Sequence, residues 1–225
     1  MNPATPSEDV LAARLRGFGP LGILAIAVVL TGSLATSLVG ALLVLLWASA
    51  SRTPWRELGY VRPRSWVASL VLGVVFGAAF KLLMKAIVMP LLGAPAINPA
   101  YHYLAGNRAA LPGAILAMTL GGGFAEETVF RGYLFERLGK IFGGGRGAKA
   151  AIVLLTAALF AMAHYHDQGM PGVEQATVTG LVFGGIFALT GQLWTVMFAH
   201  AAFDLTALAI IYWDVEPTVA HVFFR

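Results

Sequence analysis

The stretch Gly121–Lys140, with the sequence GGGFAEETVFRGYLFERLGK, places charged residues in an otherwise apolar part of the chain. It carries two adjacent glutamates, Glu126 and Glu127, and then Arg131, and seventeen uncharged residues precede the first glutamate. A charge within a long apolar segment is energetically costly, so such residues are by default candidates for a functional site. The composition of the whole sequence indicates whether this segment lies in water or in a lipid bilayer.

The composition is that of an integral membrane protein. Of 225 residues, 58% are hydrophobic and 12% are charged, with a mean hydropathy of +0.77. Soluble domains contain roughly 25% charged residues. Positions 20–50 and 175–199 form runs of 31 and 25 residues without a charge, and about 20 apolar residues are enough to cross a bilayer. Strands of a membrane barrel would alternate in polarity, which these runs do not. We therefore predict an all-α, polytopic membrane fold.

The apolar runs predict helices with short connections. We expect helices at 20–50, 66–92, 111–138, 150–165, 173–190 and 193–213. The first is long for one crossing, so it either tilts or breaks near Gly32–Ser33 into a hairpin of two short helices. This predicts six to seven transmembrane segments. The organisation expected is a short N-terminal segment (1–19), one transmembrane domain (20–213, with its motif region at 111–212) and a C-terminal tail (214–225).

Basic residues gather in two segments between the apolar runs, at positions 52–64 and 137–149. Such segments face the cytoplasm in multi-pass proteins, so the basic pI of about 9.6 is explained by the positive-inside rule. No nucleic-acid partner is expected, and the lipid bilayer is the predicted surrounding. The segment Gly93–Asn107 has no Lys or Arg and several turn formers, so we expect it on the outer side.

Helical spacing divides the roles of the charged residues in the opening stretch. Glu127 and Arg131 are four positions apart, in the acid-before-base order that favours an ion pair. We therefore predict that Glu127 and Arg131 form a structural ion pair. Adjacent residues on an α-helix point about 100° apart, so Glu126 should face a different group and remain a free carboxylate.

Three further polar residues lie in two other predicted helices. His164 ends the stretch LFAMAH, while His200 and Asp204 are four apart within HAAFDL and share a helix face. One of this last pair could orient the other, or both could meet a common ligand. Together with Glu126, this set could activate a water molecule by general base catalysis, with or without a metal. No serine or cysteine nucleophile is apparent, so hydrolysis is the predicted chemistry.

Each of these residues also has a purely structural interpretation. A single interior histidine such as His164 more often only makes a hydrogen bond than takes part in catalysis. Lys81 and Lys85, one turn apart in the second predicted helix, are expected to extend toward a membrane interface. The combination of one Glu, two His and one Asp on three helices is what favours a site.

The same residues resemble the motifs of a known family. EETVFR (Glu126–Arg131) is similar to the EExxxR motif of the CAAX-protease and bacteriocin-processing family of intramembrane endopeptidases, also called the Abi family. FAMAH (Phe160–His164) resembles its FxxxH motif, and HAAFD (His200–Asp204) its HxxxN or HxxxD motif. WRELGY (Trp55–Tyr60) resembles the stretch that precedes the second helix in bacterial members. The resemblance covers roughly residues 55 to 212.

The resemblance implies helices around a conical intramembrane cavity and a protease of the glutamate or metal-dependent type. Glu126 would activate the attacking water and His164 would help to hold it, while His200 and Asp204 would stabilise the oxyanion. An ionised Asp204 would repel an oxyanion, so it must be protonated, orient His200 or ligate a metal. No cofactor is favoured. If zinc is present, Glu126, His164, His200 and Asp204 would be its ligands.

The substrate implied is a membrane-associated protein or peptide. The resemblance places the chain in the cell membrane, in the inner membrane of a bacterium, with the active site open toward the cytoplasm. Two alternatives stay open: a membrane scaffold or chaperone of the same fold without peptidase turnover, and a cation or proton transporter that uses the same four residues. A transporter usually shows duplicated halves, and the sequence shows no duplication.

Overall fold

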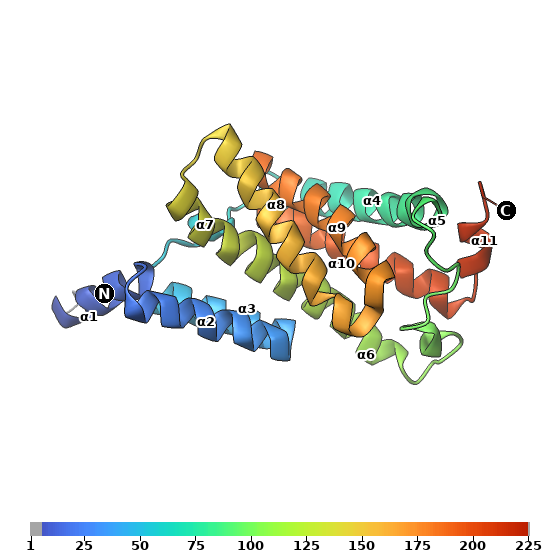
Figure 1. The fold of residues 1–225 in the computed structure, drawn as a ribbon, viewed down its shortest axis with the longest axis horizontal. Coiled ribbons are helices and arrows are strands. Elements are labelled where there is room, and N and C mark those ends of the chain that lie inside the picture. Colours follow the sequence, from blue (N-terminus) through green and yellow to red (C-terminus); the bar gives the residue numbers. More distant parts are fainter. Residues whose placement is uncertain (1–5, 225) are drawn as a thin grey trace.

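The computed structural model describes residues 6–224, and within that range the regular structure is entirely helical (Figure 1). This confirms the all-α prediction. The α-helices are α1 (Pro6–Arg16), α2 (Pro20–Ala35), α3 (Ser37–Ala50), α4 (Trp66–Leu83), α5 (Met89–Leu91), α6 (Leu111–Leu116), α7 (Leu134–Phe142), α8 (Arg146–Ala163), α9 (Tyr165–Thr190), α10 (Leu193–Tyr212) and α11 (Glu216–Ala220). Short 3₁₀ turns are η1 (Trp55–Leu58) and η3 (His102–Leu104), and π-helical segments are η2 (Met84–Val88), η4 (Ala117–Glu126) and η5 (Thr128–Tyr133).

The long N-terminal apolar run forms a hairpin of two helices, which was one of the two expected alternatives. The break lies at Thr36, slightly beyond the expected Gly32–Ser33 position, where the backbone is extended (φ −157°, ψ 146°). The Thr36 hydroxyl accepts a hydrogen bond from the Val39 amide at 3.1 Å and so caps the start of α3. Figure 1 shows α2 and α3 side by side along one flank of the bundle.

The count of six or seven spans stays a prediction, because a span is recognised here only by the length and composition of one uninterrupted α-helix. In the described residues, four helices are long and apolar enough to cross a membrane, or five if α1 and α2, bent by 62°, count as one span. The helix α3 has only 14 residues. The helical stretch 111–142 is divided between α- and π-helical parts, so its segments do not reach that length individually. The polytopic membrane fold itself is confirmed.

The outer surface of α4 is apolar, as a lipid-facing helix requires. Its exposed large apolar side chains are Trp66, Val67, Leu70, Val71, Leu72, Val74, Val75, Phe76, Leu82 and Leu83. The opposite face is formed by small residues, since Gly73 and Gly77 let α4 approach the backbone of α10 closely. A Cβ at Gly77 would lie 2.0 Å from the carbonyl oxygen of Ala199. Small residues at helix interfaces are typical of membrane bundles.

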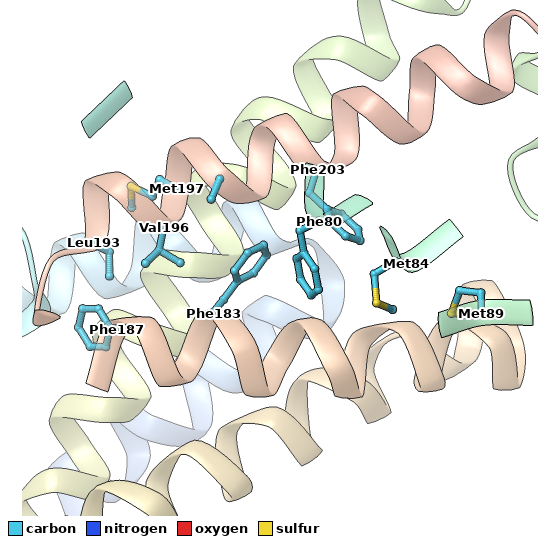
Figure 2. Close-up of a cluster of buried hydrophobic side chains, with 10 residues drawn as sticks. Phe80, Met84, Met89, Phe183, Phe187, Leu193, Val196, Met197 and Phe203 are labelled. Atoms are coloured by element: carbon cyan, nitrogen blue, oxygen red, sulfur yellow. The ribbon is translucent and has the colours of Figure 1, made fainter. Parts of the chain in front are cut away.

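The main core lies between α4, α9 and α10. Phe183 of α9 points toward Phe80 and Phe203 in this core (Figure 2), and its ring centroid lies 5.8 Å from that of Phe80. Aromatic packing of this kind fixes α9 against α10 and thereby positions the face of α10 that carries His200 and Asp204. The core therefore supports the predicted site directly.

The two lysines of the α4–η2 segment do not extend to an interface, which corrects the sequence-based expectation. Lys81 and Lys85 are 7% and 8% exposed. Lys85 Nζ forms an ion pair with Glu216 Oε1 at 2.8 Å and donates to the Ala96 carbonyl at 2.6 Å. Glu216 also accepts a hydrogen bond from the Asn98 amide. The segment after α10 therefore packs against the bundle through a buried carboxylate, a long-range contact that hydropathy does not reveal.

The segments that connect the long helices lie at one or the other end of α10. The segment before α4 lies at its beginning, where the Leu193 amide donates to the Gly59 carbonyl at 2.9 Å. The start of α8 is at this end too, since Lys149 Nζ donates to the Ala188 carbonyl. The segment 93–107 lies at the other end, where the Gly106 amide donates to the Tyr212 carbonyl at 3.0 Å. Both basic segments are thus at the same end of the molecule.

Candidate active site

The segment that carries Glu126, Glu127 and Arg131 is largely π-helical. The segments η4 and η5 cover Ala117–Glu126 and Thr128–Tyr133, with only Glu127 between them. A π-helix is wider than an α-helix, and its occurrence within a helix often marks a functional site. The angular positions of these side chains therefore differ from those that α-helical spacing predicts.

One carboxylate oxygen of Glu127, Oε1, contacts both Arg131 and His200. Arg131 Nη1 donates to Glu127 Oε1 at 2.8 Å, so the predicted ion pair is present. The same oxygen lies 2.6 Å from His200 Nδ1, a contact that the sequence did not indicate. Glu127 and Arg131 are 0% and 1% exposed, so this is a buried charged network. Glu127 is thus both an ion-pair partner and the residue that orients His200.

Two aromatic rings enclose the guanidinium group of Arg131. Its Cζ atom lies 4.6 Å from the ring centroid of Phe160 and 5.9 Å from that of Phe183. Stacking on aromatic faces stabilises a guanidinium group that is removed from water. The phenylalanine of the FAMAH stretch therefore supports the ion pair that positions the site.

Glu126 approaches the other nitrogen of the same imidazole. Its Oε2 atom lies 3.8 Å from His200 Nε2, while Glu127 occupies the Nδ1 side. The expectation that adjacent glutamates must face different groups is therefore wrong here, since the wide helix lets both approach the two edges of one ring. Glu126 is more accessible than Glu127, with 22% of its side chain exposed. It makes no ion pair with a lysine or arginine among residues 6–224.

Asp204 lies one turn after His200 on α10, and Gly122 of η4 leaves room for its side chain. Asp204 Oδ2 is 3.6 Å from His200 Nε2. A Cβ at Gly122 would lie 2.3 Å from this same oxygen and 3.7 Å from His200 Nε2. The glycine in η4 thus creates the space that Asp204 occupies. Two carboxylates, Glu126 and Asp204, consequently approach the same imidazole nitrogen.

His164 lies at the end of α8, on a third element of the site. Its Nδ1 atom is 2.8 Å from the Phe160 carbonyl oxygen, which can only accept, so Nδ1 carries the hydrogen. Its Nε2 atom has no hydrogen-bond partner in the described chain and is left as an acceptor. Its ring also packs against Phe160, with 4.5 Å between the centroids.

The four residues proposed as zinc ligands do not form a ligand set in this geometry. In the described range, no group of three or more His, Asp or Glu side chains is close enough to hold a metal ion. The separations of 3.6 and 3.8 Å from His200 Nε2 are those of charged neighbours.

Two cavities meet at Glu126 and His164. One has a volume of about 200 Å³ and is lined by polar residues that include Lys81, Gln175 and Asp204. The other has a volume of about 630 Å³ and is mainly apolar, between the α2–α3 hairpin and α8. Four residues line both cavities: Tyr101, Glu126, His164 and Gln168. The two side chains predicted to handle water thus border both spaces, and this shared boundary is called the junction.

Comparison with known proteins agrees with this arrangement of motifs. Residues 108–206 match the protein-family model described as type II CAAX prenyl endopeptidase Rce1-like, and all three motifs fall within that range. These residues belong to the CAAX-protease family. The chain matches no curated protein and no solved structure. At the level of the family, the match over these residues supports an intramembrane endopeptidase, which is a hydrolase.

The CAAX-protease motifs do not include several residues that line the site. Tyr101 comes from the segment 93–107 and Gln168 from the first turn of α9, just before the kink at Gly169, and Gln168 Nε2 donates to the Tyr101 hydroxyl at 3.2 Å. Burial raises the pKa of Tyr101 to about 12, with further contributions from nearby carboxylates that include Asp204 and Glu126, so its hydroxyl stays protonated. No sequence signal identifies Tyr101, because its place in the site depends on how the loop 93–107 folds back over the bundle.

The large cavity and the two basic segments lie at opposite ends of the bundle. The large cavity is lined by Thr36 at the hairpin tip, by Tyr101 and by Gln168. These residues lie at the end of the bundle opposite the two basic segments. The side of the membrane that each end faces stays a prediction.

Proposed function

We propose that this chain hydrolyses a peptide bond of a membrane-associated protein or peptide, with Glu126 as the general base. One observation carries the proposal: Glu126 and His164, from two different helical segments, line the junction of two cavities inside an apolar bundle. A carboxylate that makes no ion pair with a lysine or arginine of the described chain, and that lines the same cavities as a histidine nitrogen able to accept, is suited to removing a proton from water. The family match supports the same reaction class.

The first step uses the two groups at the junction. A water molecule donates one hydrogen bond to His164 Nε2, which is free to accept because Nδ1 is bound to the Phe160 carbonyl. Glu126 takes the other proton as the water oxygen attacks the carbonyl carbon of the scissile bond. The carbonyl π electrons move to oxygen and give a tetrahedral oxyanion. Glu126 then delivers its proton to the amide nitrogen, the C–N bond breaks, and an acid and an amine are released.

His200 and Asp204 are proposed to stabilise the oxyanion. Glu127 accepts the Nδ1 hydrogen of His200, which fixes the ring and aims Nε2 at the Glu126 side of the site. In its protonated form, the ring donates from Nε2 to the oxyanion. Asp204 provides a second donor only when its carboxyl group is protonated, because an ionised carboxylate repels an oxyanion.

The larger cavity is proposed to bind an apolar part of the substrate. Its walls include Leu30, Leu34, Phe130, Leu159 and Met162, and its volume of about 630 Å³ accommodates more than one large side chain. Apolar clefts with a few convergent polar groups are typical of substrate sites. A peptide segment from the lipid phase could thus reach Glu126 without passing through water.

The decisive experiment is single-site substitution of the junction residues in the full-length protein. We expect Glu126→Ala and His164→Ala to abolish peptide hydrolysis while each variant inserts and purifies like the wild type. His166→Ala is the matched control, since His166 is 96% exposed two positions after His164. Wild-type turnover by either junction variant would refute the assignment.

The same experiment separates the alternatives. A scaffold or chaperone of this fold would keep its cellular effect in the Glu126→Ala variant, and a transporter would lose cation or proton flux without any cleavage product appearing. Comparative proteomics of membranes that contain the wild type or Glu126→Ala identifies the cleaved proteins. Loss of a cleavage product only in the variant membranes is the result expected for a protease.

A further inference from the structure

Lys81 is a buried cation that no carboxylate of the described chain neutralises directly. Its Nζ atom donates to Gln175 Oε1 at 2.7 Å and lies 4.8 Å from the centroid of the Phe203 ring. In residues 6–224, no carboxylate oxygen forms an ion pair with it within 4.0 Å. Lys85, one turn away, has such a partner in Glu216. The two neighbouring lysines therefore differ in one respect: Lys85 is paired and Lys81 is not.

A buried cation without a counter-ion is destabilising, because the hydration that it loses is not replaced. The groups that contact Lys81 Nζ carry no charge: Gln175 offers the dipole of its amide group, and Phe203 offers the quadrupole of its ring. Asp204 lines the same cavity, but its closest ionisable partner is His200 Nε2 at 3.6 Å. An anion that entered this cavity would therefore gain a charge interaction that the protein itself leaves incomplete.

The wall around Lys81 carries several further hydrogen-bond donors. The Gln175 carbonyl oxygen is used by Lys81, which leaves the amide hydrogens of Gln175 available. The Asn98 side-chain oxygen accepts from the Ala100 amide, which leaves its NH₂ group available as well. Both residues line the cavity of about 200 Å³ that contains Lys81 and reaches Glu126. A cation with neighbouring amide donors is the set that a carboxylate requires.

We propose that Lys81 and Gln175 form a subsite that binds a carboxylate of the peptide substrate. The inference rests on the proposed function, because it takes the scissile bond to lie at Glu126. The large apolar cavity then holds one side of the substrate, and the smaller polar cavity holds the side that carries the carboxylate. With a volume of about 200 Å³, the smaller cavity holds only a short part of the chain.

Two sources could supply this carboxylate: the side chain of an Asp or Glu near the scissile bond, or the C-terminal carboxylate of the substrate. Three forms of one peptide that the wild type cleaves distinguish them. The first has a free C-terminus, the second a C-terminal amide, and the third a C-terminal amide with one internal Glu on the side that the smaller cavity binds. KM and kcat are measured for each form in detergent-solubilised, full-length enzyme.

We expect at least one carboxylate-bearing peptide to have a KM roughly 10- to 100-fold below that of the amide form, as a charged hydrogen bond in a buried site permits. Lys81→Met should remove this difference and leave cleavage of the amide form largely intact. Lys149→Met is the matched control, because Lys149 is exposed at the opposite end of the bundle. An unchanged preference in Lys81→Met would overturn the proposal.

Gln175→Glu gives a second test that does not require removing the lysine. The new carboxylate would pair with Lys81 Nζ in place of the amide oxygen, so the internal partner would compete with the substrate. We expect this variant to fold at least as stably as the wild type and to lose the preference for carboxylate peptides. A retained preference in a well-folded Gln175→Glu protein would contradict the subsite.

Binding measurements keep this inference separate from the catalytic one. The same three peptides are titrated into Glu126→Ala protein, with and without Lys81→Met. A carboxylate preference that disappears with Lys81→Met supports the subsite whether or not Glu126 is the base. Equal affinity for all three peptides in Glu126→Ala would refute the subsite, while full turnover by Glu126→Ala would refute only the proposed role of Glu126.

Discussion

His200 Nδ1 lies 2.6 Å from Glu127 Oε1, inside a bundle where both side chains are almost completely removed from solvent. This contact links the second glutamate of the EETVFR stretch to the histidine of HAAFD. Arg131 donates to the same oxygen at 2.8 Å, so one carboxylate oxygen joins two helices. Glu127 therefore contacts His200 of the candidate site as well as its ion-pair partner Arg131.

The first prediction concerns this contact. We expect Glu127→Gln to lower kcat by about 100-fold or more, because a glutamine side chain can present its NH₂ group to Nδ1 and favour the wrong tautomer of His200. The KM of the same peptide should change little. Steady-state kinetics checks this, with Glu57→Gln as a control at a partly exposed glutamate near the basic end. Wild-type kcat in Glu127→Gln would show that Glu127 only balances the charge of Arg131.

The second prediction concerns stability. Arg131→Ala should destabilise the protein more than Glu127→Gln does, since it leaves the Glu127 carboxylate buried without a cation and empties the space beside Phe160. Removing one partner of a buried ion pair costs about 3–5 kcal/mol. Thermal unfolding in detergent measures both variants, and Arg131→Met, which refills most of the space, separates the packing loss from the charge loss. Equal unfolding temperatures for Arg131→Ala and Glu127→Gln would argue against the pair.

The third prediction addresses the mechanism at Asp204. Without a metal, Asp204→Asn should keep or raise activity, because an amide N–H can donate to the oxyanion where an ionised carboxylate cannot. If Asp204 ligates zinc, the same change should lower metal content and rate together. Turnover and bound metal are both measured on the purified variant. We expect retained activity, and loss of metal together with activity would favour the metal-dependent mechanism.

The fourth prediction tests the close approach at Gly122. A methyl group there would meet Asp204 Oδ2 at 2.3 Å, so Gly122→Ala should displace Asp204 and lower activity by roughly 10-fold or more, as small misplacements in a catalytic site do. Gly113→Ala is the control, because a Cβ at Gly113 meets nothing within 4 Å. Equal activity of the two variants would mean that the position of Asp204 is unimportant.

The fifth prediction concerns orientation in the membrane. The chain contains no cysteine, so single cysteines can be introduced without background labelling. The positive-inside rule places the basic end in the cytoplasm. In intact cells, a membrane-impermeant thiol reagent should then label His102→Cys, beside the cavities, and leave Gly144→Cys unlabelled. The reverse pattern would place the cavity end in the cytoplasm and override the charge rule.

Hydropathy and composition were sufficient to predict the helical membrane fold, because a bilayer admits only segments that satisfy their own backbone hydrogen bonds. The hairpin of α2 and α3 was one of two alternatives, since apolar residues on both sides of Thr36 give no signal for the break. The expected six or seven spans stay a prediction, because four helices of the described residues are individually long enough to cross and the stretch 111–142 is divided into α- and π-helical parts. Lys85 appeared to be an interfacial residue because its partner, Glu216, is 131 positions away.

Helical spacing also indicated the Glu127–Arg131 pair, because residues four apart on a helix are neighbours in any tertiary context. The tertiary structure decided everything that depends on contacts between helices. It placed Glu126 and Glu127 at opposite nitrogens of one imidazole, where α-helical angles had separated them, because η4 and η5 are wider than an α-helix. It also brought Tyr101 and Lys81 to the cavities. Their positions follow from how a loop and two helices pack together, and no local sequence pattern encodes that packing.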